Sequence, residues 1–214
     1  MLEKIDFFEG LADAEIQQIE SAAERRKYEK GTVILKEDDA TDYLYILLSG
    51  QVHAYLDDEE GKRIIVNSIG PYELFGELAM FSGDKRSANI RAVETCEVII
   101  IQREVILQAV TELPTLCCNL VKRLAKKINA LTEDVSCLAL MDNYGRIARL
   151  LNQHARENDH GYLLTGQLTQ QEIADRIGSS REMVSRILKD LRIGGYIDIE
   201  KKRIKLLKPL PKGW

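Results

Sequence analysis

The sequence lacks any long hydrophobic run. Although 45% of its 214 residues are hydrophobic, apolar runs such as residues 98–101 fall far short of the roughly 20 residues that a membrane helix needs. The first residues, MLEKID, also lack the basic and then apolar pattern of a secretory signal. We therefore expect a cytoplasmic protein with ordinary hydrophobic cores and no membrane partner.

Cysteine and histidine are scarce, with four and three residues. The cysteines form no C-x-x-C pair and no group with histidine at ligand spacing, which argues against zinc, iron–sulfur and haem sites. The sequence also contains no G-x-S-x-G motif, no H-E-x-x-H motif and no glycine-rich nucleotide loop, so we expect no enzyme. We interpret the four cysteines as buried thiols (Cys96, Cys117, Cys118 and Cys137) and the three histidines as surface imidazoles (His53, His154 and His160).

Charge is distributed unevenly along the chain. The formal net charge is -4, yet residues 165–214 contain 11 Lys and Arg against 6 Asp and Glu. The C-terminal end therefore has a local charge of +5, and -9 remains for residues 1–164. This asymmetry indicates an acidic regulatory body with a domain at its end that binds a polyanion.

Short apolar segments alternate with glycine turns from about residue 32 to residue 101, which is typical of a small antiparallel barrel or roll. Ahead of them, Leu11, Ile16 and Ile19 predict an amphipathic helix that Asp13 would cap. The predicted strands are 32–35, 43–48, 52–56, 63–69, 89–93 and 97–101.

Residues 75–88, within this region, combine groups that can hold a cyclic phosphodiester on a sugar. Glu77 can accept a hydrogen bond from a ribose hydroxyl, and Arg86 offers a planar set of donors to a phosphate. Gly76 permits close approach of the backbone to a ligand, and Ser87 adds a hydroxyl. A helical turn after Gly76 would also direct free N–H groups at the anion. Taken alone, Glu77 and Arg86 fit an exposed ion pair better than a ligand site, so the assignment depends on the rest of the chain.

The region from Pro114 to about Leu140 predicts one long helix. Its apolar residues are separated alternately by four and three residues, which is the heptad spacing of two helices packed side by side. This stripe is narrower than that of a helix docked on its own domain, so we expect a homodimer rather than a seam within one chain. The predicted dimer seam consists of Cys117, Val121, Leu124, Ile128, Leu131, Val135 and Leu138.

The C-terminal third predicts a winged helix-turn-helix. A helix over 146–154 and a polar loop over 156–161 precede residues 170–188, which contain two helices joined at Gly178. Residues 196–200 and 203–207 would form the wing. The outward side chains of the second helix suit a major groove, because Arg181 and Arg186 can each bind guanine and Glu182 can accept from cytosine. The full set of predicted DNA contacts is Thr169, Gln170, Ser180, Arg181, Glu182, Ser185, Arg186, Lys189, Lys201 and Lys202.

Together these motifs resemble the CRP/FNR family of transcription regulators, and in particular its cyclic-AMP receptor branch, over nearly the full length of the chain. The resemblance rests on residues 76–78 and 86–88, on the long helix leading into 138–142 and 145–148, and on Arg181, Glu182 and Arg186. It implies an α+β fold with an antiparallel β-roll that binds a cyclic nucleotide (1–110), a dimerisation helix and hinge (111–141) and a winged helix-turn-helix domain (142–214).

The resemblance also implies a ligand pocket and an effector. In the family two polar residues of the dimer helix bind adenine, and here they fall at Leu131 and Thr132. A leucine cannot hydrogen-bond a purine edge. The resemblance makes cyclic AMP the first expectation, and because Leu131 removes one contact to the base, cyclic GMP and a cyclic dinucleotide stay as alternatives. The implied pocket residues are Gly76, Glu77, Leu78, Arg86, Ser87, Ala88, Leu131 and Thr132.

On the DNA side, the resemblance implies a regulator that recognises an inverted repeat of TGTGA-like half-sites and contacts RNA polymerase. An activator is the first expectation, and a repressor stays an alternative. Residues 138–142 would be the hinge through which the effector acts. Gln170 departs from the family, in which the best-known relative carries a basic phosphate contact. A regulatory subunit that acts on a protein partner instead of DNA is the remaining alternative.

Overall fold

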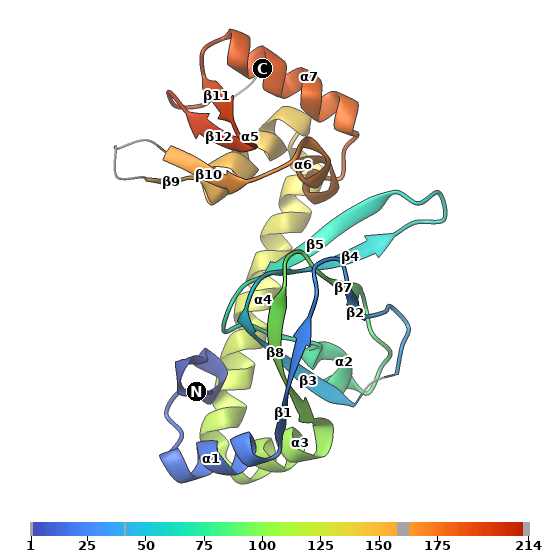
Figure 1. Ribbon diagram of the computed structural model, residues 1–214, viewed down its shortest axis with the longest axis vertical. Helices are drawn as coiled ribbons and strands as arrows, with labels where there is room; N and C mark the ends of the chain where they lie inside the picture. Colours follow the sequence, from blue (N-terminus) through green and yellow to red (C-terminus); the bar gives the residue numbers. More distant parts are fainter. Residues whose placement is uncertain (1, 41, 158–162, 212–214) are drawn as a thin grey trace. The chain divides into compact units, whose positions relative to one another are not determined.

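The computed structural model describes residues 2–40, 42–157 and 163–211 (Figure 1). The chain divides into two compact units, Met1–Asn129 and Ala130–Trp214. Helix α4 (Pro114–Leu140) contributes residues to both units. The three-part division expected from the sequence is finer than this one and remains a prediction.

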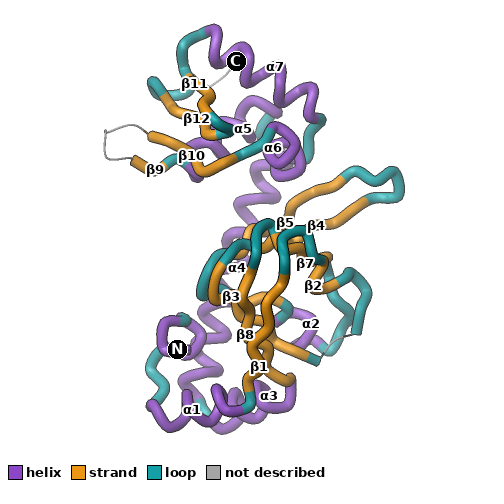
Figure 2. Tube along the Cα trace, viewed as in Figure 1, coloured by secondary structure: helices purple, strands orange, loops and turns teal. Residues whose placement is uncertain are grey.

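The first unit is an antiparallel β-roll of two four-stranded sheets (Figure 2). One sheet has the order β1-β8-β3-β6 and the other β2-β7-β4-β5. Alternate residues of both sheets bury apolar side chains, among them Leu47, Val52 and Val98, in a shared core. The strands are β1 (Ala23–Tyr28), β2 (Val33–Leu35), β3 (Tyr43–Ser49), β4 (Val52–Asp57), β5 (Arg63–Ile69), β6 (Leu74–Phe75), β7 (Asn89–Ala92) and β8 (Cys96–Gln102).

Short helices build a second core in this unit, with Phe7, Phe8 and Met80 at its centre. They are η1 (Leu2–Lys4), η2 (Asp6–Phe8), α1 (Asp13–Ser21), α2 (Glu77–Ser82) and α3 (Arg103–Glu112). The prediction that Asp13 caps α1 is wrong. Ala12 occupies the cap position, and its backbone N–H donates to Glu15 Oε2 at 2.7 Å.

The N-terminal part of α4 is fixed to this second core. Leu116 is fully buried, and Asn119 Nδ2 donates to Phe7 O at 3.2 Å and to Glu9 O at 2.8 Å. These bonds pair a buried amide with the carbonyls of η2 and of the residue that follows it. They fix where α4 starts relative to the roll.

The second unit surrounds one core with three helices and a small antiparallel sheet of order β11-β12-β10-β9. Asp142 caps α5, because its Oδ1 accepts from Gly145 N at 2.7 Å. Arg156 and Glu157 pair with β10, so the predicted polar loop is wrong at its start; residues 158–161 lie outside the described part of the chain. The elements are α5 (Asn143–His154), β9 (Arg156–Glu157), β10 (Leu163–Gln167), α6 (Gln170–Ile177), α7 (Arg181–Ile193), β11 (Ile197–Glu200) and β12 (Arg203–Leu206).

The corner between α4 and α5 is bridged by Arg149. Its guanidinium lies 3.2 Å from Glu133 Oε2 and 3.6 Å from Asp134 Oδ1, and it also contacts Cys137 Sγ. Arg149 belongs to the second turn of α5, whereas its partners belong to the last turns of α4. The two helices are therefore joined by more than the two residues that connect them.

The cysteines and histidines correct two predictions. Cys96 and Cys137 are buried as expected, but Cys117 and Cys118 are exposed. His53 was predicted at the surface and is 8% exposed, because it lies between Ser68 and Arg91 on neighbouring strands. His154 is half-buried, and His160 lies outside the described residues.

Within the described ranges, no single helix is long and apolar enough to cross a membrane. Helices α3 and α4 reach that length and composition only together, and they meet at a bend of 109°. Among the same residues, no three His, Cys, Asp or Glu side chains gather as they would around a metal ion.

Candidate functional site

Gly76 starts helix α2 in a backbone conformation that favours glycine. Its φ is 80°, in the left-handed region, and α2 begins at the next residue, Glu77. A Cβ atom at Gly76 would lie 2.5 Å from Arg86 Nη1. The position therefore excludes a side chain both by its dihedral angle and by its contact with Arg86.

Arg86 lies beneath this turn, 3% exposed. Its Nη2 donates to Tyr43 O at 2.9 Å, its Nη1 donates to Gly76 O, and the guanidinium lies 5.7 Å from the centre of the Tyr45 ring. Burial lowers the pKa of Arg86, and Tyr45, Glu77 and Asp42 counteract this effect. Because an arginine pKa starts so high, the group remains a cation. The site thus holds a buried, planar set of donors at the N-terminus of α2.

Glu77 is also 3% exposed, and its Oε1 accepts from Lys127 Nζ of α4 at 2.8 Å. Nearby, Arg123 Nη2 donates to Leu74 O at 3.0 Å. Two cations of α4 therefore lie against the part of the roll that carries Glu77. Lys127 was not predicted as a site residue, although it lies four residues before Leu131 and hence on the same helix face.

The other predicted pocket residues lie in different surroundings. Leu78 and Ser87 are exposed and Ala88 is half-buried, all in the first unit. Leu131 and Thr132 belong to the second unit. Their contribution to a ligand pocket therefore remains a prediction.

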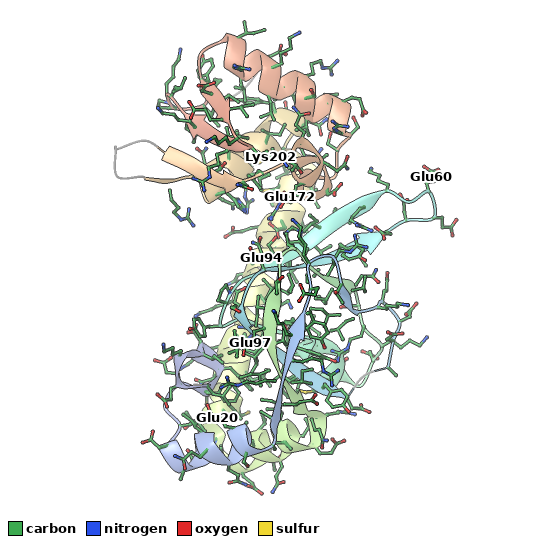
Figure 3. The ribbon with its side chains drawn as sticks, viewed as in Figure 1. Glu20, Glu60, Glu94, Glu97, Glu172 and Lys202 are labelled. Carbon is green, nitrogen blue, oxygen red and sulfur yellow. The ribbon has the colours of Figure 1, made fainter. Side chains whose placement is uncertain are left out.

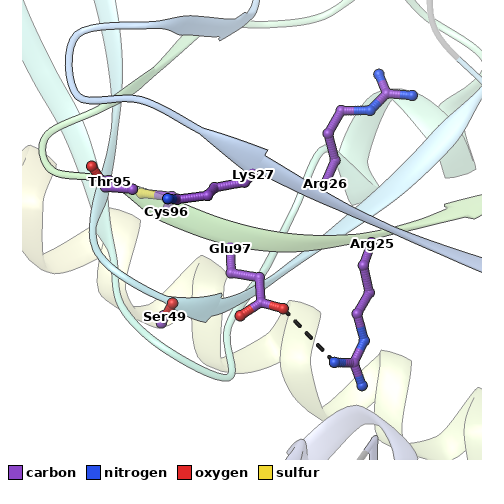
Figure 4. Close-up of a pocket in the computed structure, with 7 residues that line it drawn as sticks. All are labelled: Arg25, Arg26, Lys27, Ser49, Thr95, Cys96 and Glu97. Atoms are coloured by element: carbon purple, nitrogen blue, oxygen red, sulfur yellow. Dashed lines mark ion pairs between the residues drawn. The ribbon is translucent and has the colours of Figure 1, made fainter.

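A surface pocket of about 300 Å³ lies elsewhere on the roll, on the edge strand β1 (Figure 4). It does not include Glu77 or Arg86. Its three cations each pair with an acidic side chain, as Arg25 does with Glu97 at 3.8 Å. Exposed pairs of this kind contribute little to specific binding. The lining residues are Arg25, Arg26, Lys27, Ser49, Thr95, Cys96 and Glu97.

The predicted dimer seam is largely uncovered in the single chain. Val121, Ile128 and Val135 are 60%, 62% and 64% exposed, and Leu131 and Leu138 are 50% and 46% exposed. Cys117 is also exposed, and Leu124 is half-buried. A row of exposed large apolar side chains at heptad spacing is typical of a helix that packs against another one.

The helix-turn-helix has the predicted geometry. Thr169 Oγ1 accepts from Glu172 N at 3.1 Å at the start of α6, and Ser180 Oγ accepts from Met183 N at 3.2 Å at the start of α7. Gly178, with φ of 64°, ends α6. As predicted, Ile173, Ala174, Ile177, Val184 and Ile187 are buried in the domain core.

The residues predicted to contact DNA lie mostly at the surface. Arg181, Glu182, Arg186 and Lys189 are exposed along α7, and Ser185 is half-buried. Lys201 and Lys202 are exposed at the turn of the wing, where both have positive φ (Figure 3 labels Lys202). Thr169 and Ser180 are exposed and Gln170 is half-buried. Two of these residues, Thr169 and Ser180, also cap the helices.

Comparison with known proteins identifies both units. Residues 25–112 match the cyclic nucleotide-binding domain, and residues 145–209 match the Crp-like helix-turn-helix domain. The chain is 33% identical over 182 residues to the cAMP-activated global transcriptional regulator CRP of Salmonella typhimurium, covering 83% of this chain and 87% of the relative. The chain belongs to the CRP/FNR family of transcription regulators.

Further CRP relatives extend the match. The CRP-like cAMP-activated global transcriptional regulator of Mycobacterium tuberculosis is 26% identical over 208 residues, which cover 95% of this chain and 93% of that protein. The structure is similar to that of the c-di-GMP-responsive global regulator CLP of Xanthomonas campestris, with a TM-score of 0.82, 25% identity and coverage of 92% and 100%. It is also similar to Thermus thermophilus catabolite activator protein, with a TM-score of 0.57, 30% identity and coverage of 94% and 93%.

Membership in the CRP/FNR family confirms several predictions. The chain is a transcription regulator with a cyclic nucleotide-binding domain and a DNA-binding helix-turn-helix, and it is not an enzyme. The antiparallel roll, the long helix and the winged domain are those of the family.

Proposed function

We propose that the chain is a homodimeric, cytoplasmic regulator whose effector is cyclic AMP, bound where Glu77 and Arg86 meet. The observation that carries this proposal is a carboxylate and a guanidinium, each 3% exposed, at one helix start. A cyclic phosphate would replace the main-chain carbonyls as the partner of Arg86, because a guanidinium binds an anionic oxygen more strongly than a neutral carbonyl oxygen. A ribose hydroxyl would donate to Glu77. The pocket would consist of Gly76, Glu77, Leu78, Arg86, Ser87 and Ala88, with Leu131 and Thr132 from the dimer helix.

A different cyclic nucleotide is the second candidate. Leu131 offers no hydrogen bond to a base, so the helix specifies adenine less than two polar residues would. The similar protein CLP is described as responsive to c-di-GMP. Cyclic GMP and cyclic dinucleotides therefore compete with cyclic AMP as the effector.

Calorimetry with cyclic AMP, cyclic GMP and c-di-GMP tests the assignment. Arg86→Ala should reduce the affinity for the preferred compound by at least about tenfold, since a buried charge-assisted contact is lost. Lys85→Ala, the matched control, removes the exposed neighbouring cation and should bind normally. If wild type bound none of the three compounds, or if both variants bound equally, the pocket assignment would be wrong.

We further propose that the seam of α4 joins two protomers, so that effector binding shifts the dimer toward an arrangement that binds DNA. The DNA site would be an inverted repeat of TGTGA-like half-sites, with Arg181, Glu182 and Arg186 in the major groove. RNA polymerase would be the partner at the promoter. If the winged domain acted on a protein instead of DNA, the chain would give no gel shift on inverted-repeat DNA.

A further inference from the structure

His154 is the last residue of α5, and its ring forms a bond that fixes its tautomer. Its Nδ1 lies 2.9 Å from Leu150 O, one helical turn earlier. A carbonyl oxygen only accepts, so Nδ1 must carry the hydrogen. In the neutral ring Nε2 then has no hydrogen and is an acceptor.

The neutral acceptor faces a cation. His154 Nε2 lies 3.4 Å from Nη1 of Arg176, whose side chain is only 10% exposed. A guanidinium has donors and no acceptor, so the neutral ring suits it. A protonated ring would instead direct a donor at a donor and place two positive charges together in a half-buried site.

The other described charges around His154 do not offset the repulsion between a protonated His154 ring and Arg176. Arg156 of β9 is a second cation, and it already donates to Gln153 O and Ala155 O at the end of α5. Among the residues that the structure describes, Glu172 of α6 is the acid that acts on the His154 pKa, and it is 3.7 Å from Arg176. Burial lowers the pKa of His154, and Arg176 and Arg156 lower it further, against the opposing effects of the Leu150 carbonyl and Glu172.

Glu172, which Figure 3 labels, connects Arg176 to the start of the helix-turn-helix. Its Oε2 accepts from Thr169 N at 3.4 Å, and its own N–H donates to Thr169 Oγ1, so that the two residues form a capping box. Displacement of Arg176 would therefore disturb the side chain that caps α6. Thr169, at that cap, is a predicted DNA contact.

We propose that the contact between His154 and Arg176 makes the DNA-binding domain acid-sensitive: protonation of His154 repels Arg176, loosens the start of α6 and weakens DNA binding. The inference rests on DNA binding by α6 and α7, and it does not depend on which effector binds the roll.

The sign of the pH dependence follows from the neutral ring. In the unfolded chain His154 takes up a proton near pH 6.5. The folded domain resists that proton, so the unfolded state binds more protons as the pH falls below about 6.5. Stability of the domain is therefore full above that pH and decreases below it, until His154 is also protonated in the folded state.

The test compares full-length wild type with His154→Gln, Arg176→Gln and His53→Gln between pH 8 and pH 5.5 at constant ionic strength. Thermal unfolding and affinity for a duplex with TGTGA half-sites, in saturating cyclic AMP, are measured. Wild type should lose more affinity in acid than His154→Gln, because only wild type takes up the proton that repels Arg176. Arg176→Gln should flatten the profile as well. His53→Gln removes the buried imidazole of the other unit and should retain the wild-type slope.

Equal acid slopes for wild type and His154→Gln would overturn the inference. An NMR titration of wild type gives an independent answer that requires no variant. A His154 pKa at or above 6.5 in the folded protein would contradict the proposed repulsion. Absence of DNA binding at pH 8 would instead contradict the proposed function, so the two failures are distinguishable.

Discussion

At the scale of single residues, the partners of Glu77 and Arg86 explain how two buried charges are tolerated. Lys127 neutralises Glu77, and main-chain carbonyls accept from Arg86. A buried charge without such partners would be strongly destabilising. Both partners belong to the first unit, so the roll together with the first part of α4 supplies them.

Gly76 provides the sharpest test of the turn that holds these charges. Gly76→Ala should cost about 1 to 2 kcal/mol of stability from positive φ, and should also reduce effector binding because the new methyl group displaces Arg86. Gly61→Ala is the matched control, since Gly61 has φ of 78° but nothing within 4 Å of its Cβ position. Calorimetry and urea unfolding measure the two effects. If both variants lost effector affinity equally, the contact between Gly76 and Arg86 would not matter for binding.

At the scale of elements, hydrophobic pattern was enough to place most strands of the roll and the whole of α4. Strands β1 and β6 were not predicted, and each lacks the pattern for a physical reason. Strand β1 has the sequence AERRKY at a sheet edge, so its burial does not alternate, and β6 has only two residues. In the site, residue type suggested Glu77 and Arg86, but only the rest of the chain favoured them over an exposed ion pair, and their role in ligand binding stays a prediction. Lys127 was not suggested, because a lysine beside an apolar seam is usually solvated.

The exposed seam of α4 should be the dimer contact. Val135→Glu should give monomers, because a charge placed in a heptad core would have to be buried without a partner. Ser136→Glu, at the adjacent exposed position, should leave the dimer intact. Analytical ultracentrifugation measures both. A dimeric Val135→Glu protein would place the contact elsewhere.

At the scale of the whole molecule, the part of the chain with the DNA-binding helices is basic and the part with the nucleotide-binding roll is acidic. Residues 1–164 have a charge of -9 and residues 165–214 have a charge of +5. Long-range attraction to DNA therefore acts on the winged domain, while the acidic remainder is repelled. Association should accordingly weaken as the salt concentration rises.

Base recognition and phosphate contact should respond differently to mutation. Arg181→Ala should cost about 1 to 3 kcal/mol on the cognate half-site and much less on a site with that guanine replaced. Lys202→Ala should weaken binding to all sequences alike and reduce the salt dependence. Titrations on both duplexes at several salt concentrations separate the two. A uniform loss for Arg181→Ala would exclude base readout by this side chain.

Arg149 has a consequence for how the regulator can respond. The predicted hinge, residues 138–142, lies between Arg149 and its partners Glu133, Asp134 and Cys137. Bending there would separate the Arg149 guanidinium from two exposed carboxylates, and exposed pairs of this kind contribute little each. Because salt screens exposed charges, the resistance that these pairs offer to bending at residues 138–142 would decrease as the ionic strength rises.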